Sequence, residues 1–514
     1  MPVPSSDVLR RLSHLAAVAD PGASTAISEV FTGRVLGTVP VGDAADVAAA
    51  FGKARAAQPE WAQRPIRERT AIFERARSLL LAEWEQLLDI IQAETGKARW
   101  AAYEEAMALL LVLQYYTDKS PALLAPQRVP GVLPMIMRAG VHRKPKGVVG
   151  VIAPWNYPIA LSIGDGIPAL IAGNAVVVKP DSLTPYSPLF VTELLYRAGL
   201  PRDLLAVVPG AGRVVGRAIL DHCDFLMFTG SSATGRTLAE ECGRRLVGLS
   251  AELGGKNAMI VAKSANIDRA ATSAVRACFS NSGQLCVAIE RIYVEEPVAA
   301  EFSAKFVAAT AAMTLRAGYD FDIDMGSLIS SGQVETMLKH VTDATSKGAT
   351  VLTGGAARPD LGPLFFEPTV LTDVTDEMDC HRAETFGPLV SIYPVADVDA
   401  AVREANDTEY GLNASVWAGS RAEGEKIAIR LRTGSVNVNE GYAPAFATTA
   451  APMGGVGTSG IGRRHGPDGL LKYTDAQTVA SAGLSMDPPP FLTNEKWQNM
   501  LRSMVRAVRH LPGR

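Results

Sequence analysis

The chain has 514 residues, of which 47% are hydrophobic, and its 50 basic and 53 acidic side chains leave a formal net charge of −3. A chain of this length and composition can bury the cores of two domains, which excludes a mainly disordered protein. The balanced charge provides no general attraction for polyanions and argues against nucleic acid as a partner.

Membrane, metal and disulfide classes are also disfavoured. The longest apolar stretches, such as 106–113, are too short to cross a bilayer. The five cysteines show no C-x-x-C spacing and the seven histidines no H-x-x-x-H spacing, so neither a disulfide framework nor a metal site is predicted. We therefore expect a cytoplasmic protein with no membrane partner.

The first 120 residues or so have mostly helical periodicity. A helix is expected within 7–20, and residues 70–96 place Ile72, Ala76 and Leu80 on one helical face, with Gly96 as a stop. Two extended runs around Ala139-Gly140 then predict a β-hairpin.

From residue 148 onward, short apolar runs alternate with segments of helix length. The first series of strands is expected at 148–154, 175–180, 204–210, 225–230 and 258–263. A second series is expected at 291–297, 350–355, 365–374, 389–395 and 412–419, with a helix at 297–313. This alternation predicts parallel sheets in two α/β domains that meet near 252–256. A short extension after residue 486 is expected to end in a basic helix at 501–514.

Two strand ends have the chemistry of a cofactor site. The run 225–229 is followed by Gly230, Ser231 and Gly235, a strand–turn–helix pattern whose helix N-terminus can bind a phosphate. The alternative is a tight turn that merely needs glycine. Lys179 ends another strand, at the edge of a parallel sheet where ligands bind, although a solvated lysine would occupy the same position.

Three further residues could carry catalysis. Asn156 lies between two prolines and could donate to an oxyanion, or cap an Asx turn. Glu252 follows an apolar run, so burial would raise its pKa toward that of a general base, whereas a surface or helix-capping glutamate is the alternative. Cys286 follows a polar turn that can expose it, and a helix N-terminus or polar pocket could stabilise its thiolate. Burial in an apolar core is the alternative for Cys286 and the expectation for the other cysteines.

The chain resembles the aldehyde dehydrogenase superfamily from about residue 26 to 478. The stretches that carry the resemblance occur in the family's order: "PWNYP", "VVKP", "FTGSSATGR", "ELGGKN", "NSGQLC", "ETFGPLV", "ANDTEYGLNASVW", "GSVNVN" and "PMGGVGTSGIGRRHG". It implies two doubly wound α/β domains, a Rossmann-like cofactor domain and a catalytic domain, with a β-hairpin oligomerisation arm that builds a homodimer or homotetramer. The implied boundaries are 1–120 and 144–254 for the cofactor domain, 255–445 for the catalytic domain, 121–143 and 446–485 for the arm, and 486–514 for a C-terminal extension.

The resemblance also implies a mechanism. Cys286 attacks the aldehyde carbon, and the Asn156 side chain and the Cys286 N–H hold the oxyanion of the thiohemiacetal. Hydride then passes to a nicotinamide cofactor, and Glu252 activates the water that hydrolyses the resulting thioester. The residues implied at the cofactor are Trp155, Asn156, Lys179, Asp181, Ser182, Gly230, Ser231, Ser232, Gly235, Leu253, Glu384 and Phe386.

Cofactor and substrate follow from departures within the family pattern. Ser182 stands where NAD-dependent members carry a glutamate that repels a 2′-phosphate, which favours NADP+, while neighbouring Asp181 keeps NAD+ as an alternative. The resemblance favours succinic semialdehyde, oxidised to succinate, as the substrate. The arginine that pairs with the substrate carboxylate in well-studied members is replaced by Gly164, so Arg213 or residues of the loop 440–452 would have to take its place, and Phe446 in this loop indicates an apolar tunnel wall.

Two alternatives remain open. The chain could be an aldehyde dehydrogenase for another aliphatic or aromatic aldehyde that uses NAD+. It could also be a cofactor-independent thiol esterase, which would need a histidine beside Cys286; His465 is the one histidine within the matched stretches.

Overall fold

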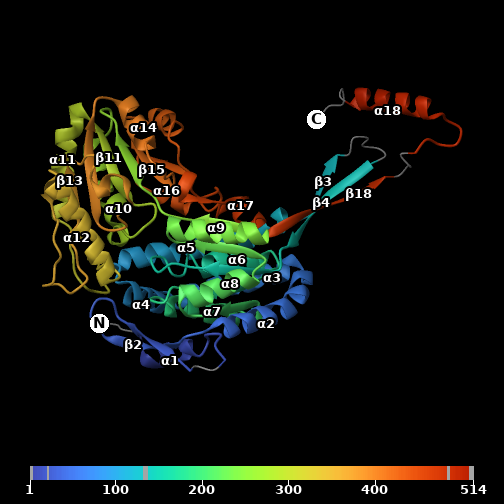
Figure 1. Ribbon diagram of the computed structural model, residues 1–514, viewed down its shortest axis with the longest axis horizontal. Coiled ribbons are helices and arrows are strands. Elements are labelled where there is room, and N and C mark those ends of the chain that lie inside the picture. The colour runs from blue at the N-terminus through green and yellow to red at the C-terminus, as the bar shows by residue number, and fades with distance from the viewer. Residues whose placement is uncertain (1–3, 20–21, 131–136, 483–486, 509–514) are drawn as a thin grey trace.

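The structure, a computed structural model, describes residues 4–19, 22–130, 137–482 and 487–508. Figure 1 shows two lobes and a projecting arm, with the first lobe drawn mainly in blue to green and the second in yellow-green to orange. The arm leaves the first lobe and carries the C-terminal helix α18 (Asn494–Val508) at its far end.

The first lobe is built around a six-stranded sheet ordered β17-β9-β8-β5-β6-β7. Its strands are β5 (Val148–Ile152), β6 (Ala175–Lys179), β7 (Leu205–Val207), β8 (Phe225–Thr229), β9 (Gly248–Glu252) and β17 (Gly460–Ile461). All neighbours are parallel except β17, which is antiparallel to β9. Every residue of β6 and β8 is buried, as predicted for a parallel sheet covered on both faces.

Helices from the N-terminal half surround this sheet and share its core. They are α1 (Ser6–Ser13), α2 (Ala44–Gln63), α3 (Ile66–Ala82), α4 (Trp84–Thr95), α5 (Arg99–Leu123), α6 (Ile163–Ile171), α7 (Tyr186–Arg197), η1 (Arg202–Leu204), η2 (Gly212–Gly216), α8 (Arg217–His222) and α9 (Ser232–Arg245). The chain also forms an antiparallel pair, β1 (Ser24–Ser28) and β2 (Val35–Pro40). The helical region predicted at 70–96 consists of parts of two helices that meet at Glu83, and Gly96 ends the second one as predicted, with a left-handed φ of 71°.

The second lobe contains a seven-stranded sheet ordered β12-β13-β14-β11-β10-β15-β16, parallel except for β12. Its strands are β10 (Asn257–Val261), β11 (Ile289–Glu295), β12 (Thr350–Thr353), β13 (Thr369–Thr372), β14 (Leu389–Val395), β15 (Asn413–Trp417) and β16 (Ser435–Val438). The other elements from this part of the chain are α10 (Ile267–Phe279), η3 (Ser280–Gly283), α11 (Glu296–Ala311), α12 (Ser331–Ser346), α13 (Asp379–Arg382), α14 (Val398–Asn406), α15 (Arg421–Ala428), α16 (Ala443–Ala447), η4 (Gly457–Ser459) and α17 (Gly466–Leu471).

The chain passes from the first sheet to the second where the sequence predicted. β9 ends at Glu252 and β10 begins at Asn257, so residues 253–256 connect the two sheets. The strand predicted at 258–263 therefore corresponds to β10 of the second sheet, although its spacing grouped it with the first series.

The arm is a three-stranded antiparallel sheet ordered β18-β4-β3, made of β3 (Gln127–Pro130), β4 (Met137–Pro145) and β18 (Thr474–Ala482). The prediction of a hairpin at Ala139-Gly140 was wrong, because both residues lie inside β4 and pair with β3 and β18. Gly140 lies within β4, although glycine at this position of the sequence had indicated a turn. In the stretch 446–485 assigned to the arm, β18 joins this sheet, whereas β17 pairs with β9 of the first lobe.

Candidate active site

Cys286 lies in a rigid turn between η3 and β11. Three successive residues before it, Asn281, Ser282 and Gly283, have left-handed φ values of 51°, 55° and 70°. The fully buried amide of Gln284 holds this turn, since its Nε2 donates to the Asn281 carbonyl at 3.2 Å and its Oε1 accepts from the Ile329 N–H at 3.0 Å. A backbone strained in this way is typical of a functional site.

Asn156 contacts the same turn from the other lobe. Its side-chain Nδ2 donates to the Gln284 carbonyl at 3.0 Å, which leaves one N–H of the amide for another acceptor. Beneath it, the buried Lys97 ammonium donates to the Asn156 carbonyl at 2.6 Å and pairs with Glu105 at 2.7 Å. The structure therefore places the Asn156 side chain against residue 284, two residues before Cys286.

Apolar and aromatic side chains surround the Cys286 sulfur. Cys286 is half-buried and packs against a cluster that contains Tyr157, Leu161, Leu285, Val287, Ala288, Leu412, Tyr442, Met453 and Phe446. Burial raises the pKa of the Cys286 thiol to about 12; Arg464 opposes this shift, while Glu252 and Glu384 add to it. Burial thus favours the thiol form of Cys286 over the thiolate that a polar pocket could have stabilised.

Glu252 ends β9 with its carboxylate buried at 3% exposure, and its Oε1 has no hydrogen-bond partner among the described residues. Gly454 leaves room for this oxygen, because a Cβ built there would lie 2.7 Å from it. Burial raises the pKa of Glu252 to about 7, with Arg464 and Lys472 opposing the shift. The pKa of Glu252 thus shifts in the direction expected for a general base, and its catalytic role stays a prediction.

Three charged residues next to Glu252 were not singled out from the sequence. The Arg464 guanidinium donates to Asp165 and, at 2.9 Å, to the Thr229 hydroxyl, on the strand that pairs with β9. The Lys472 ammonium donates to the Ser250 hydroxyl at 3.2 Å. The stretch "GRRHG" was matched only as part of a motif, and its basic character could have suggested a counter-charge for Glu252.

The side chains expected at the adenosine end of the cofactor lie together at the end of β6. Lys179 is buried, its Nζ donates to the Pro180 carbonyl at 2.8 Å, and burial lowers the pKa of this lysine. Ser182 is exposed and its hydroxyl donates to the Gly210 carbonyl at 3.3 Å, while Asp181 accepts from the Leu183 N–H. A pocket of about 450 Å³ opens nearby, lined by Ile152, Gly212, Gly216, Phe228 and Leu238 among others.

The predicted turn at Gly230 is followed by the N-terminus of α9. Ser231 caps this helix by accepting from the Thr234 N–H at 3.3 Å, and Ser232 donates to the Thr458 carbonyl at 3.0 Å. Gly235 allows close packing of α9 on Leu253, because a Cβ there would lie 2.5 Å from the leucine. The N-terminus of α9 therefore follows the end of β8 directly, which is the position at which a helix can bind an anion.

The residues expected around the nicotinamide also come together. The Trp155 and Phe386 rings lie edge to face at 5.6 Å, one from each lobe. Glu384 accepts from the Gly255 N–H at 2.8 Å, and burial, followed by the charge of Glu290, raises its pKa to about 8. Phe386 has a left-handed φ of 53°.

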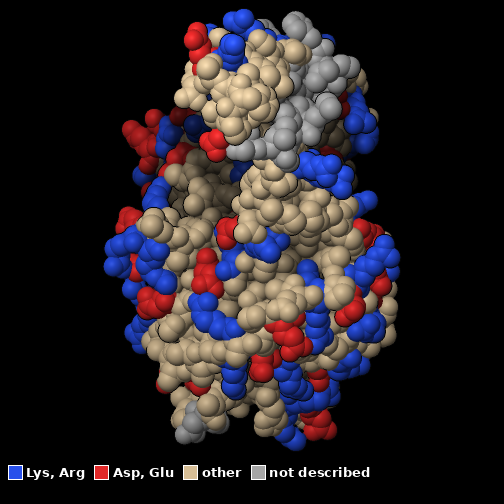
Figure 2. Space-filling model, turned by 90° about the vertical axis from the view of Figure 1, so that its right-hand side faces the viewer, with Lys and Arg blue, Asp and Glu red and all other residues tan. Residues whose placement is uncertain are grey.

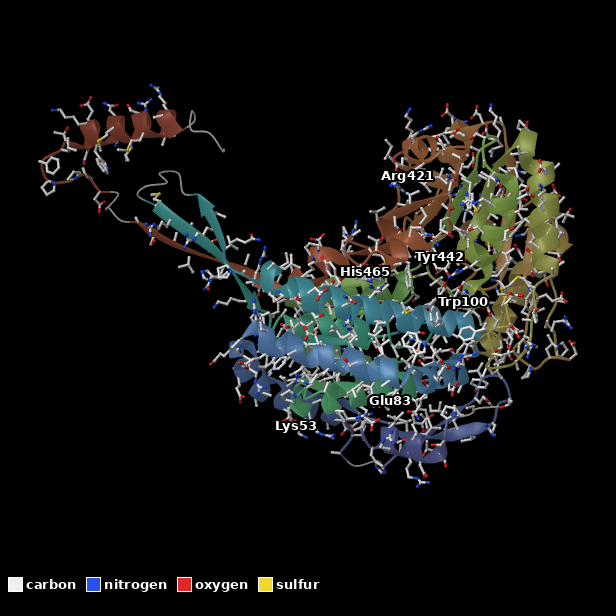
Figure 3. The ribbon with its side chains drawn as sticks, turned by 180° about the vertical axis from the view of Figure 1, so that it is seen from behind. Lys53, Glu83, Trp100, Arg421, Tyr442 and His465 are labelled. Atoms are coloured by element: carbon white, nitrogen blue, oxygen red, sulfur yellow. The ribbon has the colours of Figure 1, made fainter. Side chains whose placement is uncertain are left out.

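A thiol esterase would need a histidine beside Cys286. His465, labelled with Tyr442 in Figure 3, is buried, which lowers its pKa to about 4. Its ring forms no hydrogen bond with Cys286 in the part of the chain that the structure describes.

Arg213 lies in η2, next to Lys179 of the predicted cofactor site: a Cβ added to Gly212 of η2 would lie 4.0 Å from the Lys179 side chain. Gly164 borders a different cavity. Arg213 therefore does not replace the arginine missing at Gly164.

Within the described residues, no helix is long and apolar enough to cross a membrane. Figure 2 shows acidic and basic side chains interspersed over the face beneath the arm.

Comparison with known proteins agrees with the geometry. Residues 19–479 match the model of the aldehyde dehydrogenase family. A protein of Mycolicibacterium smegmatis that is provisionally named succinate-semialdehyde dehydrogenase [NADP(+)] is 63% identical, with 100% of both chains covered. A 4,4′-diapolycopene aldehyde oxidase from a Methylomonas species is 35% identical over 86% of this chain and 83% of its own.

Solved structures give the same result. The crystal structure of succinate-semialdehyde dehydrogenase from Burkholderia pseudomallei superposes with a TM-score of 0.86 at 35% identity, covering 90% of this chain and 96% of the other. Together with the cysteine turn, the asparagine amide and the buried glutamate, these matches identify the chain: it belongs to the aldehyde dehydrogenase family and is an oxidoreductase that acts on aldehydes.

Proposed function

We propose that the chain oxidises succinic semialdehyde to succinate with NADP+ as the electron acceptor. The observation that carries the chemistry is the meeting of Asn156, the Cys286 turn and Glu252 at the junction of the lobes. The provisional name of the Mycolicibacterium smegmatis relative supports the choice of substrate and cofactor. On this proposal the first lobe binds the cofactor and the second lobe provides the nucleophile.

The first half-reaction forms the covalent adduct. The Cys286 thiol gives its proton to solvent, because only the thiolate is nucleophilic, and the sulfur then attacks the carbonyl carbon. The remaining N–H of the Asn156 amide and the Cys286 backbone N–H stabilise the oxyanion of the thiohemiacetal, each donor contributing on the order of 3 kcal/mol to lowering the barrier. The bound nicotinamide cofactor would accept the hydride, and a thioester remains on Cys286.

The second half-reaction hydrolyses this thioester. Glu252 takes a proton from water, whose oxygen adds to the acyl carbon, and the C–S bond then breaks to release the acid. Because the pKa of Glu252 is about 7, the carboxylate is half ionised at neutral pH and can still accept a proton.

The residues at the end of β6 fit NADP+. The pocket has apolar walls, suited to an adenine, and its Gly212 and Gly216 lie next to the Lys179 side chain. The Ser182 hydroxyl donates to Gly210, two residues before Gly212. Arg213 follows Gly210, the acceptor of Ser182, by three residues and is exposed. We infer that Ser182 leaves room for the 2′-phosphate and that Arg213 supplies a positive charge for it.

A second candidate substrate is an uncharged aldehyde. The cavity beside Gly164 has a volume of about 30 Å³ and mostly apolar walls, including Leu109, Leu161, Phe446 and Met453. The Phe446 ring lies 6.2 Å from that of Tyr157, which supports the interpretation of Phe446 as part of an apolar wall. Such walls would favour an aliphatic or aromatic aldehyde over a carboxylate-bearing one.

A substrate panel decides between the candidates. Succinic semialdehyde and an uncharged aldehyde of equal chain length are assayed with NADP+ and NAD+ in separate reactions, and kcat/KM is compared. We expect succinic semialdehyde with NADP+ to give the highest value. A tenfold advantage of the uncharged aldehyde would reject the proposed substrate, and ester hydrolysis by dialysed protein without any reduction of NADP+ would favour a thiol esterase.

We also infer that the arm builds a homodimer or homotetramer. Eight of the nine β18 residues are exposed, and both edge strands of the arm sheet have unpaired outer edges within the described residues. A cytoplasmic location is part of the proposal and is supported by five free cysteines.

A further inference from the structure

Lys472 is a cation near Glu252 that has no carboxylate partner among the described residues. It follows α17, where its Nζ donates to the Ser250 hydroxyl at 3.2 Å and contacts the Met227 sulfur at 3.3 Å. Ser250 and Glu252 are two residues apart on β9, so their side chains project from the same face of the strand. Lys472 thus reaches the general base along this face.

The other cations near Glu252, Arg463 and Arg464, are arginines, and Arg464 is paired with Asp165. Its guanidinium binds Asp165 through Nε at 3.3 Å and Nη2 at 2.9 Å, and Nη2 also donates to Thr229. A paired guanidinium keeps its proton at all working pH values. Lys472 is therefore the cation of this group that can exchange a proton.

Protonation of Glu252 increases the excess of positive charge in this group. Glu252 and Asp165 carry two negative charges, whereas Arg464, Lys472 and the half-buried Arg463 carry three positive charges. When Glu252 accepts the proton of the hydrolytic water, the excess of positive charge therefore grows from one to two. Releasing a proton from Lys472 reverses this increase, because burial disfavours the charged form of an unpaired amine.

We propose that Lys472 is the positioning residue that relays the proton from Glu252 to solvent after each hydrolytic step. Lys472 itself is half-buried, and with Asp165, Arg464 and His465 it lines the cavity beside Gly164. This inference rests on the proposed role of Glu252.

The proton count closes over the hydrolytic step. Water gives a proton to Glu252, and the Lys472 ammonium releases one to solvent. The neutral Lys472 amine then takes the proton from Glu252, which restores the carboxylate and the ammonium. One proton has left, and no redox partner is involved.

The surroundings of Lys472 support this exchange. Burial lowers the pKa of Lys472 to about 8, opposed by the charges of Asp165 and Glu252 and reinforced by Arg464. The titratable and charged groups that face it among the described residues include Tyr116 of α5, Asp165 of α6, Glu252 of β9, Arg464 and His465 before α17, and Tyr473, whose ring centroid is 5.0 Å from the ammonium.

The test compares Lys472→Met, which removes the charge, with Lys472→Arg, which keeps the charge but cannot give up its proton. The burst of NADPH reports acylation, and steady-state kcat reports hydrolysis. We expect both variants to keep the burst and to lose at least about tenfold in kcat at pH 8. The acid limb of the pH profile should move up by about one unit in Lys472→Met alone, because the lost cation no longer favours the Glu252 carboxylate.

Two controls separate the possible failures. Lys146→Met removes a lysine paired with Asp475 at 2.5 Å, away from Glu252, and should leave kcat and the pH profile unchanged. Full activity of Lys472→Arg would overturn the relay, as would an unshifted profile in a folded Lys472→Met protein that still binds NADP+. Unchanged steady-state turnover in Glu252→Gln would instead reject the proposed general base.

Discussion

At the scale of single residues, burial decides the chemistry of the site. It raises the pKa of Glu252 into the neutral range, which suits a base that must both take and release a proton. It also raises the pKa of Cys286, the proposed nucleophile, to about 12, which favours its thiol form. The apolar walls that would exclude water from the adduct thus make the first deprotonation harder, and the reaction has to supply an acceptor.

Glu252 should control the pH dependence of hydrolysis. Its carboxylate must be ionised to act as a base, and with a pKa of about 7 the ionised fraction falls as the pH drops below 7. We expect kcat at pH 6 to be roughly tenfold below its plateau. Steady-state assays from pH 5.5 to 9 check this, and a profile flat down to pH 6 would contradict it.

Replacing Cys286 by serine should abolish turnover and leave cofactor binding unchanged, because a hydroxyl is far less nucleophilic than a thiolate. Fluorescence titration with NADPH and an activity assay provide the two measurements. The conserved-volume variant Cys380→Ser, at a buried cysteine in α13, tests for general sensitivity to cysteine loss. Aldehyde oxidation retained by the Cys286 variant would refute the nucleophile assignment.

At the scale of elements, short turns place the reactive groups more than helices or strands do. The η3 turn aims Cys286 through three left-handed residues, and the end of β6 brings Lys179 and Ser182 to the sheet edge. The η3 turn needs left-handed backbone conformations, and the end of β6 needs side chains of suitable size; few residue types provide either.

Gly283→Ala should disrupt the cysteine turn. Its φ is 70°, and an added Cβ would lie 2.2 Å from the Gly387 carbonyl oxygen, a backbone atom that cannot move away alone. We expect a loss of about 2 kcal/mol in the free energy of unfolding and a larger relative loss of kcat. Gly52→Ala, in α2 with no atom near the new Cβ, is the matched control and should be neutral or stabilising.

Ser182→Glu should convert the cofactor preference. A carboxylate at the end of β6 would repel a 2′-phosphate and accept from a ribose 2′-hydroxyl, so we expect kcat/KM with NADP+ to fall by about tenfold or more relative to NAD+. Ser182→Gln, which adds similar volume without charge, separates repulsion from crowding. An unchanged NADP+/NAD+ ratio in Ser182→Glu would contradict the assignment of the 2′-phosphate site.

At the scale of the whole molecule, the arm is exposed on both faces. Val129 of β3 and Val479 of β18 are 38% and 53% exposed. They lie opposite Ala139 and Gly140, two successive residues of β4, so they project from opposite faces of the sheet. Apolar residues on both faces of a projecting sheet are typical of a segment that is covered by another subunit.

Val479→Glu should weaken the proposed assembly while leaving each lobe folded. The introduced charge would be buried without a partner at a subunit contact. We expect light scattering to show a smaller mass than that of the unchanged chain, with secondary structure by circular dichroism unaltered. Thr478→Glu places the same charge one residue earlier in β18, on the opposite face of the strand, so the two variants show which face is covered. If the unchanged chain and Val479→Glu have the same mass, Val479 is not part of the subunit interface.

The sequence by itself determined the local elements and the identity of the reactive groups. Apolar runs such as 175–180 and 225–230 predicted the buried strands, because a parallel strand covered on both faces cannot contain exposed positions. The order of the motifs around Asn156, Glu252 and Cys286 likewise indicated the chemistry, since the residue types and their spacing are properties of the chain alone.

Only the tertiary structure decided which distant residues share the site and what charge they carry. Asp165 is about 300 residues before Arg464 and Lys472 in the sequence. No periodicity in the sequence links these three residues to Glu252. The apolar wall that raises the pKa of Cys286 is likewise formed by residues that are remote along the chain. Ala139 and Gly140 were expected at a hairpin, but in the fold they pair on both sides within the central strand of the arm. The reason is physical: burial and electrostatic coupling depend on distances in space, which the fold sets by packing segments that are remote along the chain.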